Sequence, residues 1–374
     1  MSEDKPEAGK GGRGDPNTGA WIGAGGLIVA AVVGGIFALL AARGGGPPTP
    51  TTSLSSPAVS VSAATTSPSS STVGNLVTLV SPGVDTVAYS FDGKYLAAGN
   101  ANGIVRVWQT SNWQVADSMT NPNSKGVTSI AFNRASSLLA AGDANGHVYV
   151  WASGHATVLS DPSDAPIRSV AFSQNNKYLA AGDTSGTINV WQTSTWRLVS
   201  SMTDPGSSGV NSVAFNPTNS LLAVGDANGR IYLWANGHAT VLNDPFGAAV
   251  RSVVFAADNR ALVSGNSAGY VYVWHVGNGE AWLTTLSPSH YEVAETLHDP
   301  DTKGIESISF NARSTTIAAA DGNGRVYLWL YNPTPGQFQY PTNDAALSVA
   351  YSPDDSYLAI ASASGNVYVK LVGS

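Results

Sequence analysis

Four aspartates fall at equivalent places in a repeated stretch of the sequence, and carboxylates placed in this way could hold a cation. The stretch LLAAGDANGHVYVW, which ends at Trp151, returns 83 residues later as LLAVGDANGRIYLW, which ends at Trp234. If the repeats close into a ring, these side chains lie near one face, where oxygen ligands suit calcium or an amine. The positions are Asp143, Asp183, Asp226 and Asp321, with Asn100 and Asn266 at two more equivalent places.

The same residues also fit a structural role, which the sequence favours. An Asp that opens an Asp-x-Asn-Gly hairpin can accept hydrogen bonds from its own backbone, and Asn-Gly readily supplies the positive φ that such turns need. A calcium loop needs several oxygen ligands within one short segment, whereas each repeat offers only two. We therefore predict hairpin turns at these places, and neither a metal nor a cofactor.

Residues that could act as nucleophiles or bases do not form a recognisable set. The chain has no cysteine, which excludes thiolate catalysis, disulfides and cysteine-type zinc sites. The GKGGRG stretch near the N-terminus lacks the Walker spacing and a preceding strand, so it does not predict a phosphate site. The histidines are scattered without metal-ligand spacing or an adjacent nucleophile: His147, His155, His238, His275, His290 and His298. We therefore predict that the protein is not an enzyme.

The composition places these residues on short strands. Charged residues are only 11% of the 374, glycine accounts for 40, and Val, Thr, Tyr and Trp recur in short clusters. This combination is typical of a turn-rich all-β protein. The formal net charge is −7, and the repeats contain no basic cluster. This argues against a nucleic acid partner, because a phosphate backbone requires a concentrated positive face.

A repeat organises the chain from Val73 onward. Each unit reads as a strand such as VTSIAFN, a polar turn, a strand such as LLAAGD, a tight turn, a strand such as HVYVW and a weaker fourth strand. A period of about 40–45 residues with four short strands is the signature of a propeller blade. The marker residues lie at intervals of 43, 40, 43, 40, 55 and 41 residues: Trp108, Trp151, Trp191, Trp234, Trp274, Trp329 and Lys370.

The segment VAFSQNNKYLAAGDTSGTINVW resembles the core of the WD40 repeat family, and similar matches recur through residues 84–374. The resemblance implies an all-β, seven-bladed β-propeller. The last unit stops after NVYVKLV without a fourth strand, while NLVTLVSP stands unpaired before the first unit. We expect these two ends to complete one blade, as in the family, and to conceal both sheet edges. The units begin near Val84, Val127, Ile167, Val210, Val250, Ile305 and Ala346.

The repeats depart from the family pattern at the residues of its buried hydrogen-bond network. The Gly-His pair that precedes the first strand is replaced by Asp-Pro, as at Asp161 and Asp244. The Asp that follows the marker Trp becomes Gln or Ala, as at Gln109 and Ala152. The His-Ser-Asp-Trp network that often locks such blades is therefore not expected here.

The chain before the repeats is organised differently. Residues 1–20 form a short polar tail, and the 21 residues Ile22–Ala42 carry no charge and could span a bilayer as a helix. We predict a transmembrane helix over residues 21–43, a Pro/Thr/Ser-rich linker over 44–72 and the propeller over 73–374. A cleaved signal peptide is the alternative, although its apolar region is normally shorter.

Basic residues set the predicted orientation of this helix. Lys5, Lys10 and Arg13 precede it and only Arg43 follows closely, so the positive-inside tendency places the N-terminus in the cytoplasm and the propeller outside. We predict a single-pass protein of the cell membrane. Small residues at every fourth position of the helix form a stripe through which two copies could associate, although any Ala/Gly-rich span produces such stripes.

Partner binding is expected where the repeats differ from one another. The second residue of each first strand should lie near the face that family members commonly use, and its variation fits either a specific surface or unconstrained drift. The long interval after Trp274 adds an insertion with two exposed aromatics, unless the insertion merely packs on its own blade. The candidate partner-binding residues are Asp85, Arg168, Asn211, Arg251, Glu306, Trp282 and Tyr291, and Thr128 and Leu347 complete the strand positions.

Two functional classes follow from this organisation. In the first, the protein is a membrane-anchored, non-catalytic scaffold or sensor module that binds a protein or peptide outside the cell. It resembles the sensor half of bacterial transmembrane kinases bearing WD40 domains, and its Ala/Gly/Thr-rich composition looks bacterial, but its short tail leaves no room for a kinase. In the second, it is an extracytoplasmic propeller enzyme or small-ligand protein that acts through the central channel. We predict the first.

Overall fold

The computed structural model describes most of the repeat region. The described residues are 71–73, 76–120, 124–203, 206–218, 221–235, 238–275, 293–298, 302–330, 338–341 and 344–372. The predicted transmembrane helix, most of the predicted linker, and the insertion residues Trp282 and Tyr291 lie outside these ranges. Within the ranges, no helix is long and apolar enough to cross a membrane.

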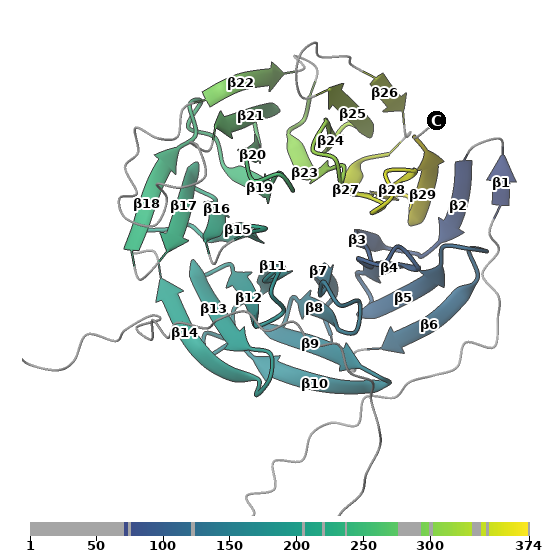
Figure 1. The fold of residues 1–374 in the computed structure, drawn as a ribbon, viewed down its shortest axis with the longest axis horizontal. Helices are drawn as coiled ribbons and strands as arrows, with labels where there is room; N and C mark the ends of the chain where they lie inside the picture. Colours follow the sequence, from purple (N-terminus) through teal and green to yellow (C-terminus); the bar gives the residue numbers. More distant parts are fainter. Residues whose placement is uncertain are drawn as a thin grey trace, which may run out of the picture. The chain divides into compact units, whose positions relative to one another are not determined.

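The described strands form seven antiparallel sheets, called blades 1 to 7, which are arranged in a ring (Figure 1). In each blade the strands follow one another from the centre outward, as β3-β4-β5-β6 do in blade 1. The innermost strands of neighbouring blades contact each other all the way round, and β27 of blade 7 contacts β3 of blade 1. The predicted seven-bladed β-propeller is therefore confirmed.

Every blade has an inner, a second, a third and an outer strand. The inner strands are β3 (Val84–Tyr89), β7 (Val127–Phe132), β11 (Ile167–Phe172), β15 (Val210–Phe215), β19 (Val250–Phe255), β23 (Ile305–Phe310) and β27 (Ala346–Tyr351). The second strands are β4 (Tyr95–Asn100), β8 (Leu139–Asp143), β12 (Tyr178–Asp183), β16 (Leu222–Asp226), β20 (Ala261–Asn266), β24 (Thr316–Asp321) and β28 (Tyr357–Ser362). The third strands are β5 (Ile104–Gln109), β9 (His147–Ala152), β13 (Thr187–Gln192), β17 (Arg230–Ala235), β21 (Tyr270–His275), β25 (Arg325–Leu330) and β29 (Asn366–Leu371). The outer strands are β6 (Val115–Thr120), β10 (His155–Ser160), β14 (Arg197–Thr203), β18 (His238–Asn243), β22 (Val293–His298), β26 (Phe338–Pro341) and β2 (Leu76–Val80).

Blade 7 is completed by strands from both ends of the described chain. Its first three strands are C-terminal, and β2 supplies the outer strand by pairing antiparallel with β29, from Leu76 opposite Lys370 to Val80 opposite Asn366. The closure predicted from NLVTLVSP is therefore confirmed. The three-residue strand β1 (Ser71–Val73) pairs outside β2 and was not anticipated from the sequence.

Apolar side chains between neighbouring blades form the core. The second strands lie between two blades, so every residue of β8 (LAAGD) and of β16 (LAVGD) is buried. The blades approach so closely that glycine is required in these strands. A Cβ on Gly182 would lie 2.3 Å from Cγ1 of Val210 in the next blade. The recurring glycine before the aspartate therefore sets the spacing between blades.

Serine hydroxyls join most inner strands to the next. An inner strand is the edge of its sheet, so alternate N–H groups lack a strand partner and need another acceptor. The serine at the third position of one inner strand accepts from the N–H of the fourth residue of the next. Ser129 Oγ accepts from Val170 N at 3.1 Å, and Ser252 Oγ accepts from Ile308 N at 3.1 Å.

This serine bond recurs at six of the seven blade junctions. The other four bonds run from Val213 to Ser169, from Val253 to Ser212, from Val349 to Ser307 and from Val87 to Ser348. Blade 1 carries Thr86 at the serine position, and within the described chain Thr86 makes no such bond to blade 2. The serine recurs in the sequence because the same acceptor is used at these six junctions.

Replacing Ser252 with alanine is expected to destabilise the propeller by about 1–3 kcal/mol, because the buried Ile308 N–H loses its acceptor. The midpoint of urea unfolding should fall, with little change in its slope. The control is Thr86→Val, which removes a hydroxyl that forms no such bond and should cost clearly less. Equal losses in the two variants would contradict the role of the serine bond.

Candidate functional site

Five of the seven predicted partner residues lie at one end of the central axis of the ring, which we call the channel mouth, whereas Trp282 and Tyr291 lie outside the described residues. Asp85, Arg168, Asn211, Arg251 and Glu306 each occupy the second position of an inner strand, and the inner strands surround the central axis of the ring (Figure 1). The connections that enter the inner strands and the turns between second and third strands lie on this same face. The backbone therefore repeats one position seven times, and six different residue types occupy it, with arginine occurring twice.

Several of these side chains bind the neighbouring blade. Arg251 Nη1 donates to Glu306 Oε1 and forms an ion pair between blades 5 and 6. Asn211 Nδ2 donates to the carbonyl oxygen of Val250 at 3.0 Å, and Thr128 Oγ1 donates to that of Ile167 at 2.6 Å. Some of the side chains that differ between blades at this position therefore hold adjacent blades together.

Arg168 and Asp85 differ from that group. Arg168 is exposed and has no ion pair within the described part of the chain. Asp85 is half-buried, and burial raises its pKa. The positive charge of Arg168 is therefore exposed at this mouth, whereas Arg251 forms an ion pair with Glu306.

The recurring aspartates form turns, as predicted. Asp183 is fully buried, and its Oδ1 accepts from Ser185 N and Thr187 N at 2.8 Å each. Asn266 Oδ1 accepts in the same way from Ala268 N and Tyr270 N at 3.0 and 2.9 Å. These bonds explain why the side chains at the ends of second strands are repeated. Among the described residues, no group of three or more His, Cys, Asp or Glu could hold a metal ion.

One of these aspartates lies beside a second buried carboxyl group. Asp161 is 1% exposed and Asp183 is fully buried, and Ser163 Oγ lies 2.9 Å from Asp161 Oδ1 and 2.5 Å from Asp183 Oδ2. A hydroxyl has one proton, so it can donate to only one of the two carboxylates. Burial, followed by hydrogen bonding and repulsion from Asp183, raises the pKa of Asp161.

In blade 5 the equivalent aspartate faces an amide instead of a second carboxyl group. Its Asp244 lies opposite Asn266 rather than a second acid, and Asn266 Nδ2 donates to both Asp244 oxygens at 3.1 and 2.9 Å. When both of its carboxyl groups are charged, the Asp161–Asp183 pair of blade 3 is therefore energetically less favourable than the Asp244–Asn266 pair of blade 5.

We expect Asp161→Asn to stabilise the protein at pH 7 by about 1 kcal/mol, because the amide keeps the Oδ1 acceptor and can donate toward Asp183. The raised pKa means that the folded protein retains a proton that the unfolded chain releases. The contribution of Asp161 is therefore most favourable at acid pH and is lost as pH rises through the folded-state pKa. Chemical unfolding of the parent chain and the variant should be measured between pH 4 and 7. The free energy of unfolding should decline less with rising pH in the variant.

The matched control is Asp244→Asn in blade 5. This change removes an acceptor of Asn266 and should destabilise the protein. If both variants changed the free energy of unfolding in the same direction, the proposed difference between blades 3 and 5 would be contradicted.

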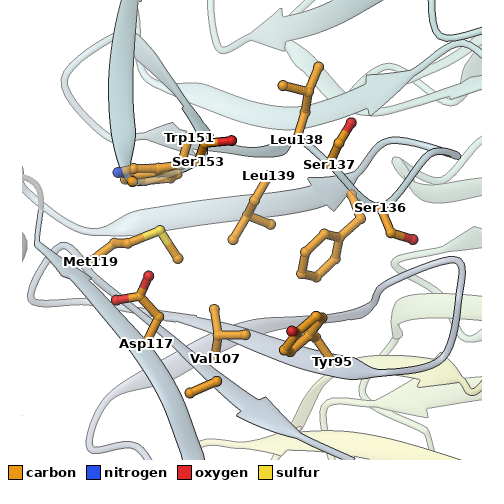
Figure 2. Close-up of a pocket in the computed structure, with 13 residues that line it drawn as sticks. Tyr95, Val107, Asp117, Met119, Ser136, Ser137, Leu138, Leu139, Trp151 and Ser153 are labelled. Carbon is orange, nitrogen blue, oxygen red and sulfur yellow. The ribbon is translucent and has the colours of Figure 1, made fainter. Parts of the chain in front are cut away.

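A pocket of about 310 Å³ lies between blades 1 and 2. Figure 2 shows Leu139 and Trp151 of blade 2 facing Val107, Met119 and Tyr95 of blade 1 across an opening. The turns Ser136–Leu138 and Ser153–Gly154 border the pocket. Both turns lie on the opposite face from the channel mouth described above. Sequence reasoning missed this pocket, although the short turn after Trp151 carried a signal for it.

Comparisons with known proteins support the fold. The family model described as WD domain, G-beta repeat, matches residues 74–109, 116–152, 154–192 and 196–235. No curated protein sequence matches the chain. The β-propeller domain of Cps50 (Swd1) from Myceliophteria thermophila is similar in structure, with a TM-score of 0.70 and 17% identity over 79% of this chain and 98% of that domain. The chain carries WD40 repeats and folds as a seven-bladed β-propeller.

One contact of the family's buried network occurs in blade 5. Trp274 Nε1 donates to Ser264 Oγ at 2.8 Å in the interior. Blade 2 has alanine, Ala141, at the place of that serine, and Trp151 Nε1 is buried without an acceptor. The difference between Ser264 and Ala141 therefore changes the tryptophan contact from blade to blade.

Proposed function

We propose that the protein is a non-catalytic scaffold or sensor module whose propeller binds a protein or peptide partner. WD40 propellers typically act as protein-interaction scaffolds, and the chain carries this repeat. The observation that supports a binding face most directly is the charge of Arg168, which is exposed at a position where Asn211 and Arg251 bind neighbouring blades. A partner with an acidic or carbonyl-rich surface would complement this charge.

The proposal includes a membrane anchor. The apolar run Ile22–Ala42 supports a single transmembrane helix, and the basic residues before it support a cytoplasmic N-terminus and an extracytoplasmic propeller. The Pro/Thr/Ser-rich segment after residue 43 would then tether the propeller at some distance from the bilayer. Self-association through the stripe of small residues would bring two propellers together.

A photo-crosslinking residue that keeps a positive charge, such as photo-lysine, is expected to capture a defined partner in native cells when it replaces Arg168, because this position faces outward at the channel mouth. The same residue in place of Thr157, on an outer strand, is the control. Full-length chains should be compared by mass shift on gels and by mass spectrometry. Identical products from both positions, or none from Arg168, would contradict a binding face at this mouth.

Reporter fusions test the anchor separately. A reporter that is active only outside the cytoplasm should work after Ser374 and fail before Met1, because the N-terminus is proposed to stay inside. The chain should also remain with the membrane after an alkaline wash. The reverse reporter pattern, or release of an intact chain by the wash, would overturn the membrane part of the proposal.

A further inference from the structure

A tryptophan from one blade fills a slot on the preceding blade at two junctions. In blade 1 the chain from Gln109 to Gln114 connects the third and outer strands, and Trp113 lies in it with a positive φ of 59°. The rings of Trp113 and Tyr357 of blade 7 form a T-shaped contact, with 5.6 Å between centroids and 83° between planes. Trp113 packs against the apolar cluster between blades 7 and 1.

Blade 3 repeats this arrangement at its junction with blade 2. The connection WQTSTW mirrors WQTSNW of blade 1, and Trp196 has a positive φ of 54°. Trp196 N donates to Gln192 O at 2.7 Å, as Trp113 N donates to Gln109 O at 2.8 Å. Trp196 packs against the cluster between blades 2 and 3, in which Leu138 takes the place of Tyr357. The same local sequence thus places the same side chain in the same slot.

Blade 2 has no such tryptophan. Its third strand ends at Ala152 and its outer strand begins at His155, so only Ser153 and Gly154 connect them. Both have positive φ, 48° and 80°, as a two-residue primed hairpin turn requires. The small residues of this turn reach only the border of the slot on blade 1 and cannot fill it. The pocket between blades 1 and 2 is the slot that this short turn leaves open.

Strand register shows that the pocket and the filled slot are built from equivalent positions. Asp117 is opposite Val107 in blade 1, as Val77 is opposite Val369 in blade 7. The slot around Trp113 includes Tyr357, Val369, Val77, Leu79, Leu96 and Trp108. The corresponding lining of the open pocket is Tyr95, Val107, Asp117, Met119, Leu139 and Trp151.

Asp117 is the one of these six positions at which the open pocket has a charged residue and the filled slot an apolar one. An acid replaces Val77 of the filled slot, while the other five positions remain apolar or aromatic. Asp117 is half-buried and has no ion pair with another described residue. A carboxylate at the rim of an apolar pocket selects a basic group beside the apolar one.

We infer that the open pocket between blades 1 and 2 binds a tryptophan side chain of a partner peptide, with a neighbouring basic residue paired to Asp117. The filled slots show that this geometry accepts an indole, and tryptophan and arginine are common anchors of protein interfaces. The inference rests on the proposed partner-binding function but uses the opposite face from Arg168. The proposals for the two sites can therefore be contradicted independently of each other.

Two probes come from the chain itself. The peptide QTSTWRLV (Gln192–Val199) carries Trp followed by Arg, and QTSNWQVA (Gln109–Ala116) carries Trp followed by Gln. Each is synthesised with 5-fluorotryptophan and titrated with the purified full-length chain, so that fluorine NMR reports only the peptide. Both should bind saturably with a dissociation constant of about 1 mM or tighter. The Trp-Arg peptide should bind about 3–10-fold more tightly.

Variants of the protein locate the binding. Asp117→Asn should remove the preference for the Trp-Arg peptide, because the rim charge is lost. Asp117→Trp should fill the mouth of the pocket and abolish binding of both peptides. Thr157→Trp is the matched control, because Thr157 is opposite Val150 in blade 2, beside the slot that Trp196 already fills. This control should bind like the parent chain.

A turn exchange keeps the test independent of folding defects. Replacing residues 152–155 of blade 2 with the sequence QTSTWR of blade 3 should seat the new tryptophan in the pocket, raise the melting temperature and abolish peptide binding. Absence of saturable binding by the parent chain, or binding that persists in the Asp117→Trp variant, would overturn the inference. Crosslinking at position 168 is independent of these results, so its outcome tests the proposed function separately.

Discussion

The unpaired edge of each inner strand is the constraint on which the rest of the propeller depends. A ring of sheets exposes one strand of every blade to the centre, and its inward N–H groups need acceptors away from water. Serine hydroxyls of the preceding blade supply them at 3.0–3.3 Å at six junctions. A hydroxyl reaches the next strand only if the blades lie close together. The glycines of the second strands permit this approach, because a Cβ on Gly182 would lie only 2.3 Å from Cγ1 of Val210 in the next blade.

Much of the fold follows from the sequence because the repeats are tied to local chemistry. The tryptophan interval predicts seven blades, and the unpaired NLVTLVSP predicts the strand that closes blade 7 through β29. The aspartate turns were also predictable, since an Asx turn depends on residues only two and four positions away. The serine bonds were not predicted, although the serine recurs visibly, because its acceptor role depends on the distance between blades.

The candidate sites were less predictable for the same reason. Sequence variation marked the channel-mouth positions but could not show that Arg251 pairs with Glu306 or that Asn211 binds Val250, because these contacts join different blades. The buried neighbours Asp161 and Asp183 are 22 positions apart in sequence and meet only in the folded blade. The open pocket reflects a difference in turn length between repeats. Both proposed binding sites lie where the repeats differ from one another.

A crystal structure of the full-length chain with the peptide QTSTWRLV would test this account most directly. The account predicts the indole between Tyr95 and Trp151, in the position that Trp113 takes at the preceding junction, with the arginine of the peptide near Asp117. The short Ser153–Gly154 turn should remain unchanged, because the slot exists before the peptide binds. A peptide seated elsewhere on the propeller, with the pocket empty, would contradict the claim that the missing tryptophan creates a binding site.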